Sequence, residues 1–245
     1  MRGFRILQGS NACIAEGISA LVVGDLHIGI EFKFQEQGMH VRNAAKRMAQ
    51  TISRLCDENN LQKIVFLGDI KDTVGYSPSQ ERLAVRDFFA TLTKYELHVA
   101  KGNHDSHLEA ILDSLGFHPH ISNEILLGDY AFMHGNTLPG EEALAKKYIA
   151  VGHLHAALKE AFGYRKVFVF AKAKKRVNSK LSYNKSAVLI ALPAFSDLIL
   201  GSDVTEKAAK YAPALRLGIF DWDNAEVFGF DGKPVGRIKS LRKQD

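Results

Sequence analysis

Histidines follow short apolar runs at five places in this 245-residue chain, each within a few residues of the end of the run. These histidines are His27, His104, His134, His153 and His155. The other five of the ten histidines have no such context. A single histidine after a strand is usually structural, but imidazole is also the commonest metal ligand. The repeated placement therefore indicates a metal site.

Carboxylates accompany the first of these histidines. Asp25 lies two residues before His27, and residues two apart in a strand share a face, so both side chains can reach one cation. Asp69 follows the apolar run 63–67 and Gly68, and a carboxylate there can bridge two cations about 3.5–4 Å apart. His155 can complete the ligands of the first cation.

Donors for a second cation come later in the chain. Asn103 offers an amide oxygen, and His134 and His153 offer imidazole nitrogens. So many imidazoles disfavour an all-carboxylate magnesium site, and the absence of paired cysteines disfavours structural zinc. We therefore predict two divalent metal ions, with manganese preferred and iron, zinc or nickel as alternatives.

Each motif alone has a structural interpretation. The sequence Gly68-Asp69 is compatible with a turn that ends a strand, and 102–105 with a turn before a helix, because Asn and Asp favour such places. The stretch 152–155 is more specific, since two histidines flanking one apolar residue rarely end a strand for packing reasons. The five motifs together favour the metal site.

Short apolar runs alternate with amphipathic stretches, which predicts a layered α/β architecture with ligands at the carboxyl ends of the strands. The expected strands are 4–7, 12–15, 20–23, 63–67, 97–100, 124–127, 130–133, 148–151, 166–170, 187–192, 215–220 and 226–230, with helices at 41–59, 78–92, 106–115 and 141–148. We expect Ser77 to cap the second helix, Ser106 and Glu109 to form a capping box, and 221–225 to join the last two strands. One domain, 1–245, is the simplest organisation.

The composition is that of an ordinary globular protein, with 46% apolar and 24% charged residues. We interpret Cys13 and Cys56 as buried thiols in a reducing compartment. No apolar run reaches membrane-spanning length, and the N-terminus lacks the apolar core of a signal peptide, so a cytoplasmic protein without membrane association is expected. The net charge of +5 suits an anionic partner.

The motif order Asp-x-His, Gly-Asp-x-x-Asp, Gly-Asn-His-Asp, His-Gly and Gly-His-x-His resembles the calcineurin-like metallophosphoesterase superfamily over residues 21–155. The stretches 192–195 and 201–203 also resemble small SbcD-related phosphoesterases, although the chain is too short for the additional domains of SbcD-type nucleases. The resemblance implies a two-sheet β-sandwich flanked by helices. It also implies hydrolysis of a phosphate ester by metal-bound hydroxide.

The same resemblance assigns roles to particular residues. Asp25, His27, Asp69 and His155 would hold one metal, and Asp69, Asn103, His134 and His153 the other. His104 falls on the catalytic histidine, which is not a ligand, and Asp105 on the acid that orients it.

Basic residues between Arg165 and Lys185 occur with no acid among them and are interleaved with aromatic residues. They form either a grip on a nucleic-acid backbone, with Lys172, Lys174, Lys175 and Arg176 as substrate contacts, or a solvated hairpin. Lys71 likewise either contacts phosphate or is a solvated loop lysine.

Three functions follow from these features. The preferred one is a phosphodiesterase or nuclease acting on DNA, RNA or nucleotides. The second is a phosphomonoesterase or pyrophosphatase for small metabolites, and the third is a non-catalytic scaffold of the same fold, ranked last because no ligand position is missing. The oligomeric state is not predicted.

Overall fold

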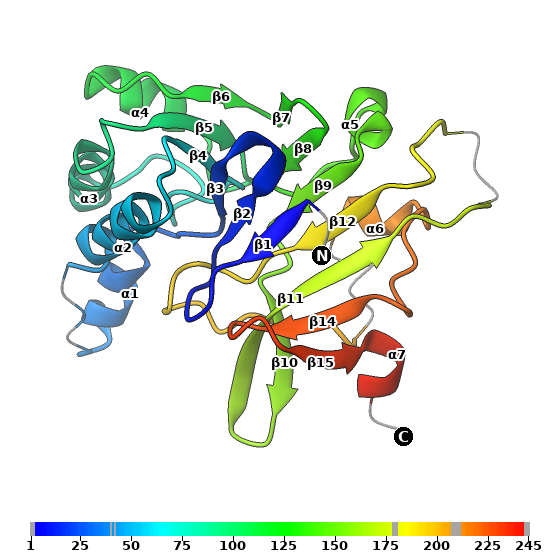
Figure 1. Ribbon diagram of the computed structural model, residues 1–245. Coiled ribbons are helices and arrows are strands. Elements are labelled where there is room, and N and C mark those ends of the chain that lie inside the picture. Colours follow the sequence, from blue (N-terminus) through cyan, green and yellow to red (C-terminus); the bar gives the residue numbers. More distant parts are fainter. Residues whose placement is uncertain (1–2, 40, 42, 178–180, 207–211, 243–245) are drawn as a thin grey trace.

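The computed structural model describes residues 3–39, 41, 43–177, 181–206 and 212–242. Two β-sheets face each other, and helices cover their outer faces (Figure 1). This arrangement confirms the predicted two-sheet sandwich flanked by helices.

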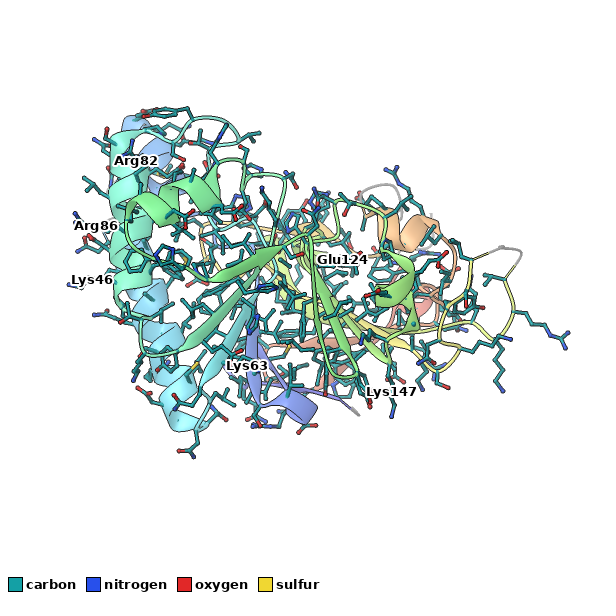
Figure 2. All side chains as sticks on the ribbon, turned by 90° about the horizontal axis from the view of Figure 1, so that it is seen from above. Lys46, Lys63, Arg82, Arg86, Glu124 and Lys147 are labelled. Atoms are coloured by element: carbon teal, nitrogen blue, oxygen red, sulfur yellow. The ribbon has the colours of Figure 1, made fainter. Side chains whose placement is uncertain are left out.

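The first sheet has six strands in the order β1-β2-β3-β4-β5-β6. Their bounds are β1 Phe4–Ile6, β2 Cys13–Ala15, β3 Ala20–Val23, β4 Lys63–Phe66, β5 Glu96–Ala100 and β6 His120–Ser122. Strands β3 to β6 are parallel, so their carboxyl ends meet at one edge. Four helices lie along the chain between these parallel strands: α1 Ile30–Glu36, α2 Ala44–Glu58, α3 Ser79–Ala90 and α4 Leu108–Ser114. The apolar faces of α2 and α3 pack on this sheet, while Lys46, Arg82 and Arg86 lie on the outer side of these helices (Figure 2).

The second sheet has nine strands, with the order β13-β10-β11-β12-β9-β8-β7 and with β14 and β15 attached at β11. Their bounds are β7 Glu124–Leu127, β8 Tyr130–Met133, β9 Tyr148–Val151, β10 Ala156–Glu160, β11 Gly163–Lys172, β12 Val188–Ala191, β13 Ser202–Asp203, β14 Glu226–Gly229 and β15 Pro234–Arg237. Three short helices, α5 Glu141–Ala145, α6 Pro213–Arg216 and α7 Ile238–Leu241, contribute buried side chains to its outer face.

The core between the sheets is built from residues that alternate along the strands. Val65 and Phe132, from opposite sheets, and Phe168 from β11 belong to one buried cluster. Their neighbours in sequence point outward to the helix layers. Because each sheet buries both faces, only its edges are left for polar side chains.

Several local predictions were wrong. The capping residue of α3 is Pro78 rather than Ser77, whose buried hydroxyl makes no hydrogen bond among the described residues. Ser106 bonds the Val74 carbonyl instead of capping α4. The expected strand 215–220 begins inside α6, which ends at Arg216, so 221–225 joins no hairpin, and β14 pairs with β11 and β15.

Candidate metal centre

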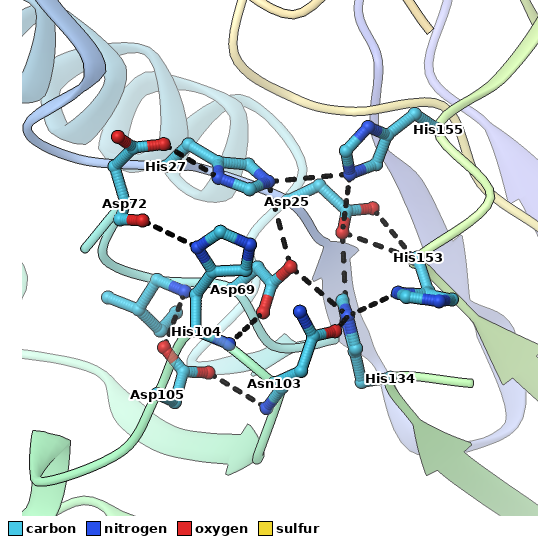
Figure 3. A network of polar contacts seen from close by, with 12 residues as sticks. Asp25, His27, Asp69, Asp72, Asn103, His104, Asp105, His134, His153 and His155 are labelled. Carbon is cyan, nitrogen blue, oxygen red and sulfur yellow. Dashed lines mark hydrogen bonds and ion pairs between the residues drawn. The ribbon is translucent and has the colours of Figure 1, made fainter. Parts of the chain in front are cut away.

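Polar side chains gather where the carboxyl ends of β3, β4 and β5 meet those of β8 and β9 (Figure 3). The loops after the first three strands carry Asp25 and His27, Asp69, and Asn103 with His104. The loops after β8 and β9 carry His134, His153 and His155. The structure therefore brings together all seven residues predicted as metal ligands.

The first cluster comprises Asp25, His27, Asp69 and His155, whose ligand atoms all lie within 4.8 Å of one another. His27 Nε2 is 3.6 Å from Asp69 Oδ2 and 3.4 Å from His155 Nε2. His155 Nε2 is 3.3 Å from Asp25 Oδ1. Two carboxylates and two imidazoles thus converge on one point.

The second cluster comprises Asp69, His134 and His153, again with ligand atoms within 4.8 Å. His134 Nε2 is 3.2 Å from Asp69 Oδ2 and 3.1 Å from both His153 Nδ1 and Asn103 Oδ1. Asp69 is common to both clusters, and its Oδ2 faces an imidazole nitrogen of each. This is the position that a bridging carboxylate must occupy.

The donor chemistry at the second cluster fits a cation. His134 Nδ1 donates to the Leu67 carbonyl oxygen at 2.7 Å, so the lone pair of a neutral ring lies on Nε2. That nitrogen faces the carboxylate oxygen of Asp69 and the amide oxygen of Asn103, which only accept hydrogen bonds, so a proton or a metal ion must lie between these lone pairs. Mixed nitrogen and oxygen donors suit manganese, iron or zinc.

Charge coupling within the buried cluster shifts its pKa values. Burial lowers the pKa of His134, but the Asp69 and Asp25 carboxylates outweigh burial and raise the pKa to about 9. Burial raises the pKa of Asp69, but His134 outweighs it and holds the pKa well below its usual range. Without metal, the cluster therefore retains a proton where a cation would bind.

Backbone strain concentrates at the same residues. Five of the predicted ligands are non-glycine residues with positive φ: Asp25 (57°), His27 (46°), Asp69 (49°), His153 (63°) and His155 (43°). Such conformations are uncommon for residues with a Cβ, although Asp and His adopt them more readily than most, and they cluster at functional sites. Gly102 also permits close approach, because a Cβ there would lie 2.2 Å from Asp69 Oδ1.

His104 lies beside the first cluster without belonging to it. Its ring centroid is 4.8 Å from that of His27, and its main-chain N–H donates to Asp69 Oδ1 at 2.9 Å. Ring Nδ1 donates to the main-chain carbonyl oxygen of Asp72 at 2.5 Å. This bond fixes the ring and leaves Nε2 without a hydrogen bond to any described residue.

Asp105 does not orient His104, contrary to the prediction. Its fully buried carboxylate accepts hydrogen bonds from the main-chain N–H groups of Ile70 at 2.8 Å and Gly102 at 2.9 Å. Since these amides belong to the loops after β4 and β5, the carboxylate joins the two loops that carry Asp69 and His104. Asp105 therefore positions backbone rather than an imidazole ring.

Asp72, the last residue of the motif Gly-Asp-x-x-Asp, has a role that was not predicted from the sequence. His27 Nδ1 donates to Asp72 Oδ1 at 3.2 Å, and Lys33 Nζ lies 2.5 Å from Asp72 Oδ2. A carboxylate behind a ligand histidine fixes the tautomer and makes the ring a better donor. Asp72 therefore supports His27 through its side chain and His104 through its backbone.

The predicted basic contacts lie elsewhere. Lys71 is fully buried, and its ammonium bonds the carbonyl oxygens of Thr73 and Gly75, so the solvated-loop interpretation is wrong. In the strand register Lys172 lies opposite Val188, and Val188 lies opposite Tyr148 at the start of β9. Lys172 is therefore at the end of the sheet opposite the metal cluster, which follows the end of β9. The structure therefore does not bring Lys172, or Lys174, Lys175 and Arg176 beyond it, to the predicted ligands.

A family model described as calcineurin-like phosphoesterase matches residues 18–157. The chain belongs to this family. The match confirms the superfamily resemblance of the sequence motifs. The clustered histidine and aspartate side chains of the structure suit the divalent metals that this family binds. The finer likeness to SbcD-related enzymes stays a prediction.

The solved structures with similar folds include the nuclease MPE of Pseudomonas putida, at 18% identity, a TM-score of 0.62 and 94% coverage of both chains. Another is Yfce, a phosphoesterase from E. coli, at 15% identity and a TM-score of 0.40, covering 89% of this chain and 97% of the other. Among curated proteins, none matches this chain.

Two smaller expectations can also be compared with the structure. Cys13 and Cys56 are buried free thiols, as predicted. Among the described residues, no helix combines the length and apolarity needed to cross a membrane.

Proposed function

We propose that this protein hydrolyses phosphodiesters with the help of two divalent metal ions, manganese being preferred, and that nucleic acids or nucleotides are its substrates. The observation that carries the proposal is the position of Asp69, which belongs to two converging clusters of nitrogen and oxygen donors. One ion would be held by Asp25, His27, Asp69 and His155. The other would be held by Asp69, Asn103, His134 and His153.

Such a pair of ions, when bound, supplies positive charge to the phosphate oxygens and makes an attacking water more acidic. The chain supplies the remaining functions. Buried carboxylates and imidazoles fix where the phosphate can lie, and the strained loops hold these donors in place before substrate arrives. Pre-organised charge of this kind provides most of the acceleration in phosphoryl transfer.

His104 completes the reaction in this proposal. As the water oxygen bonds to phosphorus, the water loses a proton to solvent and the bond from phosphorus to the leaving oxygen breaks. The leaving oxygen takes a proton from His104 Nε2, and solvent reprotonates that nitrogen before the next turnover. The Nδ1–H bond to the Asp72 carbonyl oxygen persists throughout and keeps Nε2 directed at the leaving oxygen. His104 thus acts as a general acid and as a positive charge beside the phosphate.

The preference for diesters draws support from the fold shared with nuclease MPE, which is an analogy between folds. We also propose a cytoplasmic location, which the two buried free thiols favour.

The test compares bis-p-nitrophenyl phosphate with p-nitrophenyl phosphate, using protein stripped with EDTA and then reloaded with manganese. We expect turnover of the diester that depends on manganese and is abolished in Asp69→Asn. Faster turnover of the monoester would show a phosphomonoesterase instead. An inert protein with manganese bound would favour the scaffold.

A further inference from the structure

The hairpin formed by β10 and β11 begins immediately after the predicted ligand His155. Ala157 pairs with Lys166 and Glu160 with Gly163, whereas the pairings of β11 with β12 and β14 start only at residues 169 and 167. The outer part of the hairpin therefore projects as two strands from the metal edge of the second sheet, at the bottom of Figure 1.

Two aromatic side chains are exposed on this projection. Phe162, in the turn between the strands, is fully exposed at 103%, and Tyr164 is 39% exposed. Single exposed apolar residues are common on protein surfaces. A two-stranded projection has no core to bury these rings, however, so they contribute little to folding and are available to a partner.

Strand alternation shows which way one of these rings faces. Tyr164, Lys166 and Phe168 share a face of β11, and Phe168 lies in the core between the sheets. Lys166 Nζ donates to the carbonyl oxygens of Ala194 at 2.8 Å and Ser196 at 2.6 Å. The amide of Ser196 in turn bonds the carbonyl oxygen of Asp25, a predicted metal ligand. Tyr164 is therefore on the face of the hairpin that is directed toward the metal loops.

One lysine on that face, Lys159, forms no ion pair with a described residue, whereas Lys166 lies 3.9 Å from Asp197 Oδ1. Lys159 lies directly opposite Tyr164 in the strand register and is exposed. No described acid lies within 4.0 Å of its ammonium, whereas Arg165 on the other face is paired with Glu160 at 2.8 Å. An unpaired cation beside exposed rings matches the backbone charge and stacking surfaces of an unpaired nucleic-acid strand.

We propose that the hairpin face bearing Lys159, Phe162 and Tyr164 binds an unpaired strand of the nucleic-acid substrate beside the metal centre. Bases stack on the two rings, and Lys159 binds a backbone phosphate. Tyr164 precedes Phe168 by four residues on β11, which corresponds to roughly 13 Å along the strand. A strand of several nucleotides can span that distance, whereas a small diester cannot. This inference rests on the proposed function and adds the substrate class.

The experiment measures manganese-dependent cleavage of a short single-stranded oligonucleotide and of bis-p-nitrophenyl phosphate by the same variants. Phe162→Ala and Tyr164→Ala should each raise KM for the oligonucleotide roughly tenfold, equivalent to about 1.4 kcal/mol. Tyr164→Phe keeps the ring and should resemble the wild type. All variants should hydrolyse bis-p-nitrophenyl phosphate at the wild-type rate, because that molecule does not reach the hairpin.

Lys159→Ala has a matched control in Lys174→Ala, an exposed lysine beyond the opposite end of the sheet. Lys159→Ala should reduce the salt dependence of oligonucleotide binding by about one phosphate contact, and Lys174→Ala should leave it unchanged. Equal effects of the two variants would show that only overall charge matters and would overturn the proposal.

The outcomes separate this inference from the proposed function. A wild-type protein that fails to hydrolyse bis-p-nitrophenyl phosphate with manganese refutes the proposed function. Hydrolysis of that diester together with wild-type oligonucleotide cleavage by all hairpin variants refutes only the hairpin inference. A second result would also refute only the hairpin inference: the protein binds anionic lipid vesicles, and Phe162→Ala abolishes this binding but leaves the oligonucleotide KM unchanged.

Discussion

Replacing His104 with asparagine separates catalysis from metal binding. The imidazole Nδ1 donates to the Asp72 carbonyl oxygen at 2.5 Å, and an asparagine amide can donate to the same oxygen. The main-chain N–H of residue 104, which bonds Asp69 Oδ1, is unaffected by the change. His104→Asn therefore removes the Nε2 donor and its charge while the groups around Asp69 keep their contacts.

The expected loss follows from the role of the missing group. Positioned general acids contribute roughly 10²–10⁴-fold, so kcat for a diester should fall by that factor, equivalent to about 3–5 kcal/mol in activation free energy. The loss should be larger for an oligonucleotide than for bis-p-nitrophenyl phosphate, because p-nitrophenolate departs readily without a proton. Metal content and thermal stability should match the wild type.

The assay combines steady-state kinetics on both substrates with metal analysis of the desalted variant. His118→Asn is the matched control, since His118 is exposed and outside both clusters. A variant that has lost its metal would show that His104 is a ligand or holds the ligands in place. Equal losses on the two diesters would show that His104 stabilises charge without giving a proton.

Three further outcomes are expected. Asp72→Asn should weaken manganese binding roughly 10- to 100-fold in a metal titration, because the carboxylate behind a ligand imidazole is lost. In EDTA-treated protein, the pKa of His134 is raised to about 9, above its value in the unfolded chain. The protonated imidazole therefore contributes its full stabilisation of the fold at pH values below the unfolded pKa. The melting temperature should fall as pH rises through about 9, a loss on the order of 3 kcal/mol that manganese-loaded protein does not show. Gly102→Ala places a Cβ against Asp69 and should destabilise the protein by about 1–3 kcal/mol with loss of metal, whereas Gly75→Ala, whose Cβ meets nothing within 4 Å, should do neither.

The strands that carry the candidate ligands could be predicted from the sequence because they are buried on both faces. Residues 64–67 and Tyr148–Val151 are continuous apolar runs, and the first polar residue after each one must lie at the sheet edge. Parallel pairing of these strands then places the loops together.

Contacts that depend on loop conformation could not be predicted. The positive φ of Asp69 and His155 could not be predicted, because Asp and His adopt such conformations more often than most residues but only at a few positions. Asp105 and Asp72 each follow a candidate ligand by two or three residues, Asn103 or Asp69. The carboxylate of Asp105 nevertheless meets backbone amides, and that of Asp72 meets an imidazole. Only the folded loops decide between these two uses.

The short elements were missed for a different reason. Strand β6 has three residues and β13 two, which is too short for alternation to be visible. The residues Leu215–Phe220 look like a strand by composition, but Pro213 opens a short helix there instead.

The central claim is that the side chain of Asp69 joins two metal ions. Electron paramagnetic resonance of manganese-loaded protein, with the metal content measured on the same sample, tests this claim most directly. We expect two manganese ions per chain and a spectrum of two magnetically coupled ions, because a shared carboxylate holds them about 3.5–4 Å apart. One ion per chain, or two with the spectrum of isolated manganese, would contradict the account.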